Sequence, residues 1–194
     1  MTTIRSFLAL TDPAKPLLTW YSPTERTELS GATLGNWVAK MSNLLVNECG
    51  LGPGDVAEID LPPHWQTAVI LLASWNVGLT VGESGDVSFG LPGSEAEYTL
   101  TLHPFQQSDW VVAVRAHGDH YSGATADVGD VLDLGLKPGD RALFNVDTHP
   151  DPREWLLAPL AAGASIVACT GLDETALAKT FAAEKATWPA PQTP

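Results

Sequence analysis

A gapless internal repeat constrains the fold of this 194-residue chain more than any other feature of its sequence. The segment Gly-Leu-Gly-Pro-Gly-Asp at 50–55 returns as Gly-Leu-Lys-Pro-Gly-Asp at 135–140. Further along, Leu-Ala-Ser-Trp-Asn-Val-Gly at 72–78 returns as Leu-Ala-Pro-Leu-Ala-Ala-Gly at 157–163. The differences 135 − 50 and 157 − 72 are both 85, so the two units align without an insertion and are expected to fold alike.

Each unit, 50–82 and 135–170, has the pattern of a Pro-Gly-Asp turn, an apolar strand, a helix ending at glycine and a second strand. Strands that alternate with helices are typical of parallel sheets covered on both faces. The pattern therefore predicts a doubly wound, mostly parallel α/β fold with helices on both faces of the sheet. The expected strands and helices of the two units are, in chain order, 56–61, 65–75, 79–81, 142–146, 155–160 and 166–169.

The rest of the chain adds further expected elements. Apolar residues at spacings of three and four predict a helix between Ser30 and Gly50, with Thr33 as its N-cap. We expect residues 1–188 to form a single domain and the proline-rich segment 189–194 to be a tail. The other expected elements are a hairpin of 17–21 and 26–29, strands at 87–89, 98–102 and 110–114, and a helix at 173–184.

Composition and charge exclude several classes of partner. The formal net charge is −13 and no stretch gathers basic residues, so a nucleic acid partner is not expected. The same charge disfavours anionic membranes, and no apolar run approaches the roughly 20 residues that span a bilayer. The N-terminus lacks a secretion signal, which predicts a cytoplasmic protein. Cys49 and Cys169 have no metal-ligand spacing and are interpreted as buried thiols.

The order of these motifs resembles the beginning of the adenylate-forming enzymes, a superfamily that includes acyl-CoA synthetases, luciferases and non-ribosomal peptide adenylation domains. The resemblance covers most of the chain and about the first third of a full-length family member. It implies a fold like the N-terminal subdomains of acyl-CoA synthetases. The segments that carry it are 26–30, 34–49, 50–55, Leu61-Pro62-Pro63-His64, 72–78, 135–144, His149, 157–169 and Lys185-Ala186-Thr187.

The chain departs from the family at the phosphate-binding loop. Family members hold the ATP phosphates with a loop of glycines and small hydroxyl residues that ends in a lysine. Here no lysine occurs between Met41 and Leu136, and the remnant Tyr-Ser-Gly-Ala-Thr-Ala at 121–126 is followed by Asp127, Asp130 and Asp133. Carboxylates repel a triphosphate. The family's adenine-binding strand, ribose-binding aspartate and catalytic lysine lie beyond the matched part.

These departures predict no adenylation activity, no catalytic residue and no cofactor. Ser122, Gly123 and Thr125 of the loop remnant remain candidates for binding a ligand, and His149 is similar to a position that lines the acyl pocket in the family. The leading hypothesis is a non-catalytic, stand-alone binding or interaction protein of unknown ligand.

Several alternatives stay open. Imidazoles and a carboxylate at His117, Asp119 and His120 are ligand types for zinc or iron, so an enzyme of altered chemistry could use residues 117–122 at the carboxyl edge of the sheet. A solvated loop is the simpler interpretation. The chain could also be a subunit that completes an adenylate-forming enzyme, or could self-associate through an apolar surface.

Three further patterns have simple structural explanations. Asp147 and His149 could form a hydrolytic pair, although a βα loop and helix N-cap are expected there. Ser122 lacks the Gly-x-Ser-x-Gly elbow of a nucleophile. Four tryptophans on expected helices are interpreted as core residues: Trp37, Trp65, Trp75 and Trp155.

Overall fold

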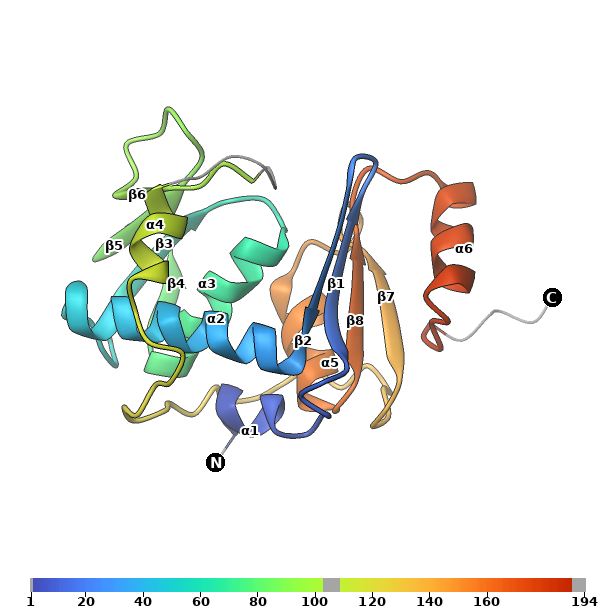
Figure 1. Ribbon diagram of the computed structural model, residues 1–194, viewed down its shortest axis with the longest axis horizontal. Coiled ribbons are helices and arrows are strands. Elements are labelled where there is room, and N and C mark those ends of the chain that lie inside the picture. The colour runs from blue at the N-terminus through green and yellow to red at the C-terminus, as the bar shows by residue number, and fades with distance from the viewer. Residues whose placement is uncertain (1, 103–108, 190–194) are drawn as a thin grey trace. The chain divides into compact units, whose positions relative to one another are not determined.

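The computed structural model describes residues 2–102 and 109–189, and the chain divides into two compact units (Figure 1). Unit 1 comprises Met1–Arg5 and Leu34–Gly129, and unit 2 comprises Ser6–Thr33 and Asp130–Pro194. Each unit contains one four-stranded sheet and one copy of the sequence repeat. Parallel strand pairs flanked by helices confirm the predicted α/β class, with the strands shared between two sheets.

Unit 1 is built on a wholly parallel sheet with the strand order β4-β3-β5-β6. Helix α3 is apolar on every side, which is the pattern of a helix buried in a core, and 11 of its residues are buried. The strands are β3 (Val56–Asp60), β4 (Thr80–Gly82), β5 (Val87–Gly90) and β6 (Tyr98–Thr99). The helices that supply residues to unit 1 are α1 (Ile4–Leu8), α2 (Gly31–Asn43), the π-helical turn η1 (Leu44–Glu48), α3 (Trp65–Val77) and α4 (Asp109–Arg115).

Unit 2 has a mixed sheet with the strand order β2-β1-β8-β7. The predicted hairpin forms the antiparallel pair β1 and β2, while β8 lies parallel to both β1 and β7. The strands are β1 (Pro16–Ser22), β2 (Glu25–Ser30), β7 (Arg141–Asn145) and β8 (Ser165–Cys169). The helices are the π-helical turn η2 (Arg153–Leu157), α5 (Ala158–Ala161) and α6 (Glu174–Ala183).

The two repeat units keep the same two hydrogen bonds at the same offset, one to the aspartate carboxylate and one between backbone groups. In each unit the aspartate of the Pro-Gly-Asp turn accepts an N–H from three residues earlier, and the preceding glycine donates to the glycine that ends the helix. The pairs are Gly52 and Asp55 (2.8 Å) with Gly54 and Gly78 (3.3 Å), and Lys137 and Asp140 (2.8 Å) with Gly139 and Gly163 (3.0 Å). Strands β3 and β7 begin directly after these turns, so the turn geometry sets where each sheet starts.

The predicted strand at 110–114 is wrong, because these residues lie in helix α4. A short run of tryptophan and valines fits either structure, and periodicity alone does not separate the two. The observed burial is helical: Trp110, Val111 and Val114 are buried while Val112 is 60% exposed. Asp109 in the first turn complements the helix dipole.

Three smaller interpretations also need correction. Ser30, not Thr33, caps α2, because the Ser30 Oγ accepts the Thr33 N–H at 3.1 Å. Of the two thiols only Cys169 is buried, whereas Cys49 is half-buried. Of the four helical tryptophans only Trp155 is fully buried, at 1% exposure. Trp37, Trp65 and Trp75 keep part of their indole in solvent, as large side chains often do.

A charge network ties the C-terminal end of α6 to the sheet of unit 2. Glu184 accepts hydrogen bonds from the Tyr21 hydroxyl at 2.5 Å, from Arg26 at 2.9 Å and from Arg141. Its side chain is 9% exposed, and that of Arg141 is 15% exposed. Burial alone would raise the pKa of Glu184, but the hydrogen bonds from Tyr21, Arg141 and Arg26 outweigh it and lower the pKa to about 2.

This pKa predicts how unit 2 responds to acid. Because the pKa of Glu184 falls from 4.5 to about 2 on folding, the group stabilises the fold above pH 4.5 and this stabilisation is lost between pH 4.5 and pH 2. The loss should be roughly 3 kcal/mol in all, of which about 2 kcal/mol falls above pH 3. Urea unfolding of the wild type and of Glu184→Gln, followed by circular dichroism from pH 7 down to pH 3, measures it. The variant should lose less stability than the wild type on acidification, and an equal loss in both would show that other carboxylates are responsible.

Candidate functional site

The segment 121–126, interpreted from the sequence as the remnant of a phosphate-binding loop, lies in unit 1 and turns around the Tyr121 side chain. The Tyr121 hydroxyl donates to the Ala124 carbonyl oxygen at 3.1 Å, closing a short turn. A Cβ at Gly123 would lie 2.3 Å from the Tyr121 hydroxyl oxygen, so any larger residue here would displace the Tyr121 side chain. Ser122 is exposed, and Gly123 and Thr125 are half-buried. Ser122 and Gly123 therefore lie inside the turn closed by Tyr121, and Thr125 directly follows it.

The backbone donors that follow this turn are bonded inside the protein. The Ala126 N–H donates to the Asn76 carbonyl oxygen at 2.9 Å, and the Val128 N–H donates to the Thr2 carbonyl oxygen at 2.8 Å. The Gly129 N–H donates to the Asp127 carboxylate at 2.9 Å. Phosphate loops bind anions with free N–H groups that lead into a helix N-terminus. Residues 116–140, all of them described, form neither helix nor strand.

The acidic residues of this segment take up N–H groups that an anion would need. The Asp127 carboxylate accepts from the Gly129 and Thr2 N–H groups, and these two bonds lower its pKa. Asp133 accepts from the Gly135 N–H at 2.9 Å in the same way. The carboxylates predicted to repel a triphosphate are thus also hydrogen-bonded to the loop backbone.

The N-terminal segment of the chain fastens this loop to unit 1. Arg5 donates to the Tyr121 carbonyl oxygen at 2.7 Å, and the Thr2 backbone contributes the two bonds to residues 127 and 128 described above. Arg5 is the one cation whose hydrogen bond lies directly on the loop remnant among the described residues. Its exposure makes it the residue to test if any anion is found there.

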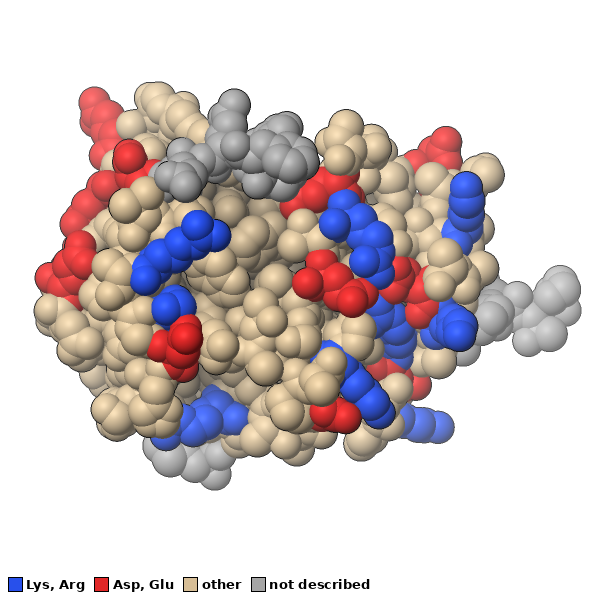
Figure 2. All heavy atoms as spheres, viewed as in Figure 1, with Lys and Arg blue, Asp and Glu red and all other residues tan. Residues whose placement is uncertain are grey.

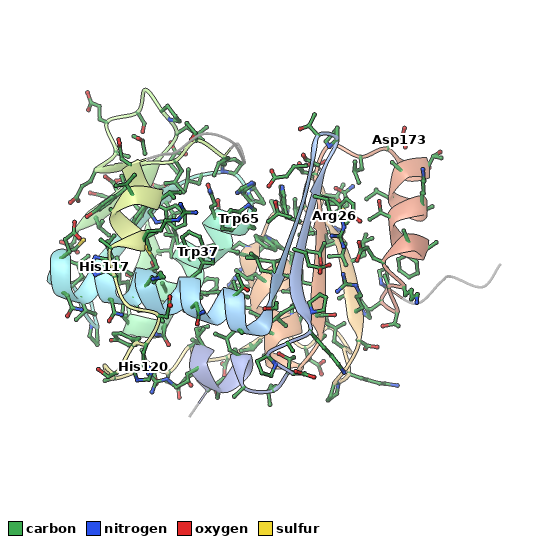
Figure 3. All side chains as sticks on the ribbon, in the orientation of Figure 1. Arg26, Trp37, Trp65, His117, His120 and Asp173 are labelled. Atoms are coloured by element: carbon green, nitrogen blue, oxygen red, sulfur yellow. The ribbon has the colours of Figure 1, made fainter. Side chains whose placement is uncertain are left out.

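The segment with the candidate metal ligands is held against α2 and η1. The His117 Nε2 lies 3.0 Å from a Glu48 carboxylate oxygen, and Lys40 pairs with Asp119 at 2.9 Å. Figure 3 shows His117 and His120 at separate places beside α2. Within the described residues no three His, Cys, Asp or Glu side chains are arranged to hold a metal ion. The polar side chains of this loop instead bind it to α2 and η1.

Asn43 of α2 also holds this loop, through its side-chain amide. Its Nδ2 donates to the carbonyl oxygens of Gly118 and His120, at 3.0 and 2.9 Å. Lys40 adds a bond to the His117 carbonyl oxygen at 2.6 Å. Three backbone carbonyl oxygens of this loop, at residues 117, 118 and 120, therefore accept hydrogen bonds from two residues of α2 that are far away in the sequence.

In unit 2, Asp147 and His149 follow strand β7. The Asp147 carboxylate accepts from the Thr170 hydroxyl and the Gly171 N–H, both at 2.6 Å, and so joins the carboxyl ends of β7 and β8. His149 is exposed, and its Nδ1 lies 3.0 Å from the Thr148 hydroxyl. His149 belongs to unit 2, whereas Ser122, Gly123 and Thr125 belong to unit 1.

The two thiols lie in surroundings that disfavour the thiolate. Burial, followed by the negative charges of Glu184 and Asp147, raises the pKa of Cys169 to about 12. Burial also raises the pKa of Cys49, which lies 3.5 Å from the Tyr98 hydroxyl. Neither thiol is therefore activated for nucleophilic chemistry.

An aromatic cluster that the sequence did not predict lies in unit 1. Trp37 of α2 is stacked on Trp110 of α4, with ring centroids 5.6 Å apart, and meets the edge of Trp65 of α3 at 5.7 Å. Figure 3 shows Trp37 and Trp65 close together in the middle of the view. The Arg115 guanidinium lies 5.8 Å from the centre of the Trp37 ring. The cluster was missed because residues 110–114 were predicted to form a strand. A helix at 109–115 would have placed Trp110 and Arg115 on one element that packs against Trp37.

Comparisons with solved structures define the class of the fold as the N-terminal part of adenylate-forming enzymes. An acyl-CoA synthetase from Brucella canis matches 95% of this chain with a TM-score of 0.70 at 15% identity. An artificially fused adenylation–PCP di-domain, NpsA-ThdA from Klebsiella oxytoca, matches 96% with a TM-score of 0.67 at 14% identity. The matches cover 49% and 42% of those proteins, so the chain spans about half of their length. The predicted resemblance is confirmed at the level of the fold.

The sequence of one curated relative identifies the family of this chain. A protein of Mycobacterium tuberculosis (strain ATCC 25618 / H37Rv) named TIGR03089 family protein is 33% identical in an alignment that covers 91% of this chain and 91% of that protein. The chain belongs to the TIGR03089 family. No protein-family model matches it. In the described part of the chain, the helices are too short or too polar to span a bilayer.

Proposed function

We propose that this chain is a non-catalytic relative of the N-terminal domain of adenylate-forming enzymes and acts as a binding protein. The scaffold that carries the family's chemistry is retained, since both βαβ units keep their turns, strands and helix ends. The ATP-handling loop is replaced by a turn around Tyr121. The proposed setting is the cytoplasm, without nucleic acid or a membrane as partner.

One observation carries this proposal: the N–H groups after the loop remnant are already hydrogen-bonded. A triphosphate at this place would have to break the bonds of Ala126, Val128 and Gly129. Of the three acceptors, the Asn76 carbonyl belongs to a buried residue, and leaving a buried acceptor unsatisfied costs about 1–3 kcal/mol. The bound triphosphate would also lie beside the Asp127 carboxylate, whose lowered pKa keeps it ionised at neutral pH.

The cations of unit 1 would do little to offset the lost hydrogen bonds and the repulsion by Asp127. They are Arg5, Lys40 and Arg115, and the first two are engaged with a backbone carbonyl oxygen and with Asp119. On the face drawn in Figure 2, Lys and Arg side chains are interspersed with Asp and Glu instead of forming one basic patch. Stabilising the charge that develops at an α-phosphate requires several fixed cations. Adenylation is therefore not expected.

Pyrophosphate exchange tests the absence of adenylation. The purified chain should give no exchange above background with Mg-ATP and a panel of short, long and aromatic carboxylic acids, while an active acyl-CoA synthetase assayed in parallel should exchange readily. Exchange that depends on one acid and disappears in Ser122→Ala would contradict the proposal, because it would show that the remnant still handles ATP.

A further inference from the structure

We propose that Trp37, Trp65 and Arg115 of unit 1 form a binding site for a planar aromatic anion. This inference rests on the binding role proposed above and supplies a ligand class for it. The three side chains come from α2, α3 and α4, which are helices of the same unit.

The indoles form a fixed platform. Trp110 is fully buried, stacks on Trp37 with an angle of 16° between the rings, and donates its indole N–H to the Met41 sulfur at 3.3 Å. Trp65 meets Trp37 at 63°, so the two rings present two differently oriented surfaces. Both Trp37 and Trp65 are half-buried, so part of each side chain is exposed to solvent. Aromatic rings prefer such offset or edge contacts to each other, and a bound ring can extend the cluster.

Arg115 makes the proposed site prefer ligands with a negative charge. It is exposed, and among the described residues it forms no ion pair with a carboxylate, although the chain has 23 acidic residues. The other four arginines differ, because each donates to a carboxylate or to a carbonyl oxygen: Arg5, Arg26, Arg141 and Arg153. The guanidinium of Arg115 instead lies over the Trp37 ring, where cation–π attraction holds it while its N–H groups remain able to bind an anion.

The indoles and the guanidinium together indicate a ligand with a flat aromatic ring and an attached anionic group. A flat apolar ring can stack on the indoles and on the planar guanidinium, and an attached anionic group can accept its N–H donors. A neutral aromatic compound would gain only the stacking, and a small inorganic ion would gain only the charge while facing a protein of net charge −13. A carboxylate or a sulfonate on a bicyclic ring supplies both.

The test is a titration with 2-naphthoate, followed by calorimetry and by the indole N–H resonances of ¹⁵N-labelled protein. We expect saturable binding that shifts the signals of Trp37 and Trp65 and leaves those of Trp20 and Trp155 in unit 2 unchanged. The neutral isostere 2-naphthalenemethanol should bind at least about tenfold more weakly. 1-Naphthalenesulfonate should bind comparably, because the site recognises charge and shape and not a carboxylate alone.

A matched pair of arginine variants decides whether the binding is at this site. Arg115→Gln should weaken 2-naphthoate binding at least about tenfold, whereas Arg153→Gln, an exposed arginine of unit 2, should leave it unchanged. Both variants are at exposed positions and should fold. Absence of saturable binding at millimolar 2-naphthoate, or equal affinities in Arg115→Gln and the wild type, would overturn the proposed site. Pyrophosphate exchange with Mg-ATP on the same sample separates the two ideas, because exchange would contradict the non-catalytic role and leave the naphthoate result standing.

Discussion

Replacing Glu184 with alanine is expected to lower the free energy of unfolding by about 3–5 kcal/mol at pH 7. The change leaves the Arg141 guanidinium, which is 15% exposed, without its carboxylate, and it removes the acceptor of the Tyr21 hydroxyl. A charge held near the protein interior without its partner is among the costliest defects that one substitution can create. Urea unfolding followed by circular dichroism measures the loss, and faster hydrogen exchange in β7 and β8 would locate it in unit 2.

The chain offers a matched control for this prediction. Glu28 also accepts from Arg26, at 2.7 Å, but its side chain is 34% exposed and it has no contact with Arg141. Glu28→Ala should therefore cost less than about 1 kcal/mol, the usual range for an exposed ion pair. Equal losses in the two variants would mean that burial and the contact with Arg141 do not matter, and the description of this network would be wrong.

Replacing Trp110 with alanine is expected to destabilise unit 1 by about 3–5 kcal/mol. The side chain is fully buried, stacks on Trp37 and donates to the Met41 sulfur, so its removal leaves a cavity and breaks both contacts. Thermal and urea unfolding give the size of the effect. Hydrogen exchange should be faster in α2 and α4, and 2-naphthoate binding should weaken because the platform is no longer fixed.

Val112→Ala is the control from the same helix. Val112 lies two positions after Trp110 but is 60% exposed, so its truncation should change the unfolding free energy by no more than about 0.5 kcal/mol. A destabilisation as large as that of Trp110→Ala would indicate that residues 109–115 do not form the helix described, and the aromatic cluster would lose its basis.

The βαβ units could be predicted because their determinants are local. Each Pro-Gly-Asp turn closes through an N–H only three residues before its aspartate, and the strands follow at once. The hydrophobic pattern then separates helix from strand wherever the run is long enough. Residues 109–115 were assigned wrongly because a seven-residue run with three valines has no decisive period.

The candidate site could be predicted only in part, because its contacts join distant segments. The sequence indicates that the lysine of the phosphate loop is missing, but not that Thr2 and Asn76 accept the N–H groups of residues 128 and 126. It places His117 and Asp119 near each other, but not opposite Glu48 and Lys40. The Glu184 network likewise joins residues up to 163 positions apart. Such pairings depend on the tertiary fold, which local patterns do not encode.

Isothermal titration of Mg-ATP into the intact chain tests the central claim most directly. With the loop donors bonded internally and carboxylates beside them, we expect no saturable heat of binding at micromolar nucleotide. Arg5→Gln serves as the companion variant, since Arg5 is hydrogen-bonded directly to the loop remnant. Saturable binding at micromolar Mg-ATP that is weakened in Arg5→Gln would contradict the proposed loss of ATP handling, because it would show that the loop remnant still binds a triphosphate.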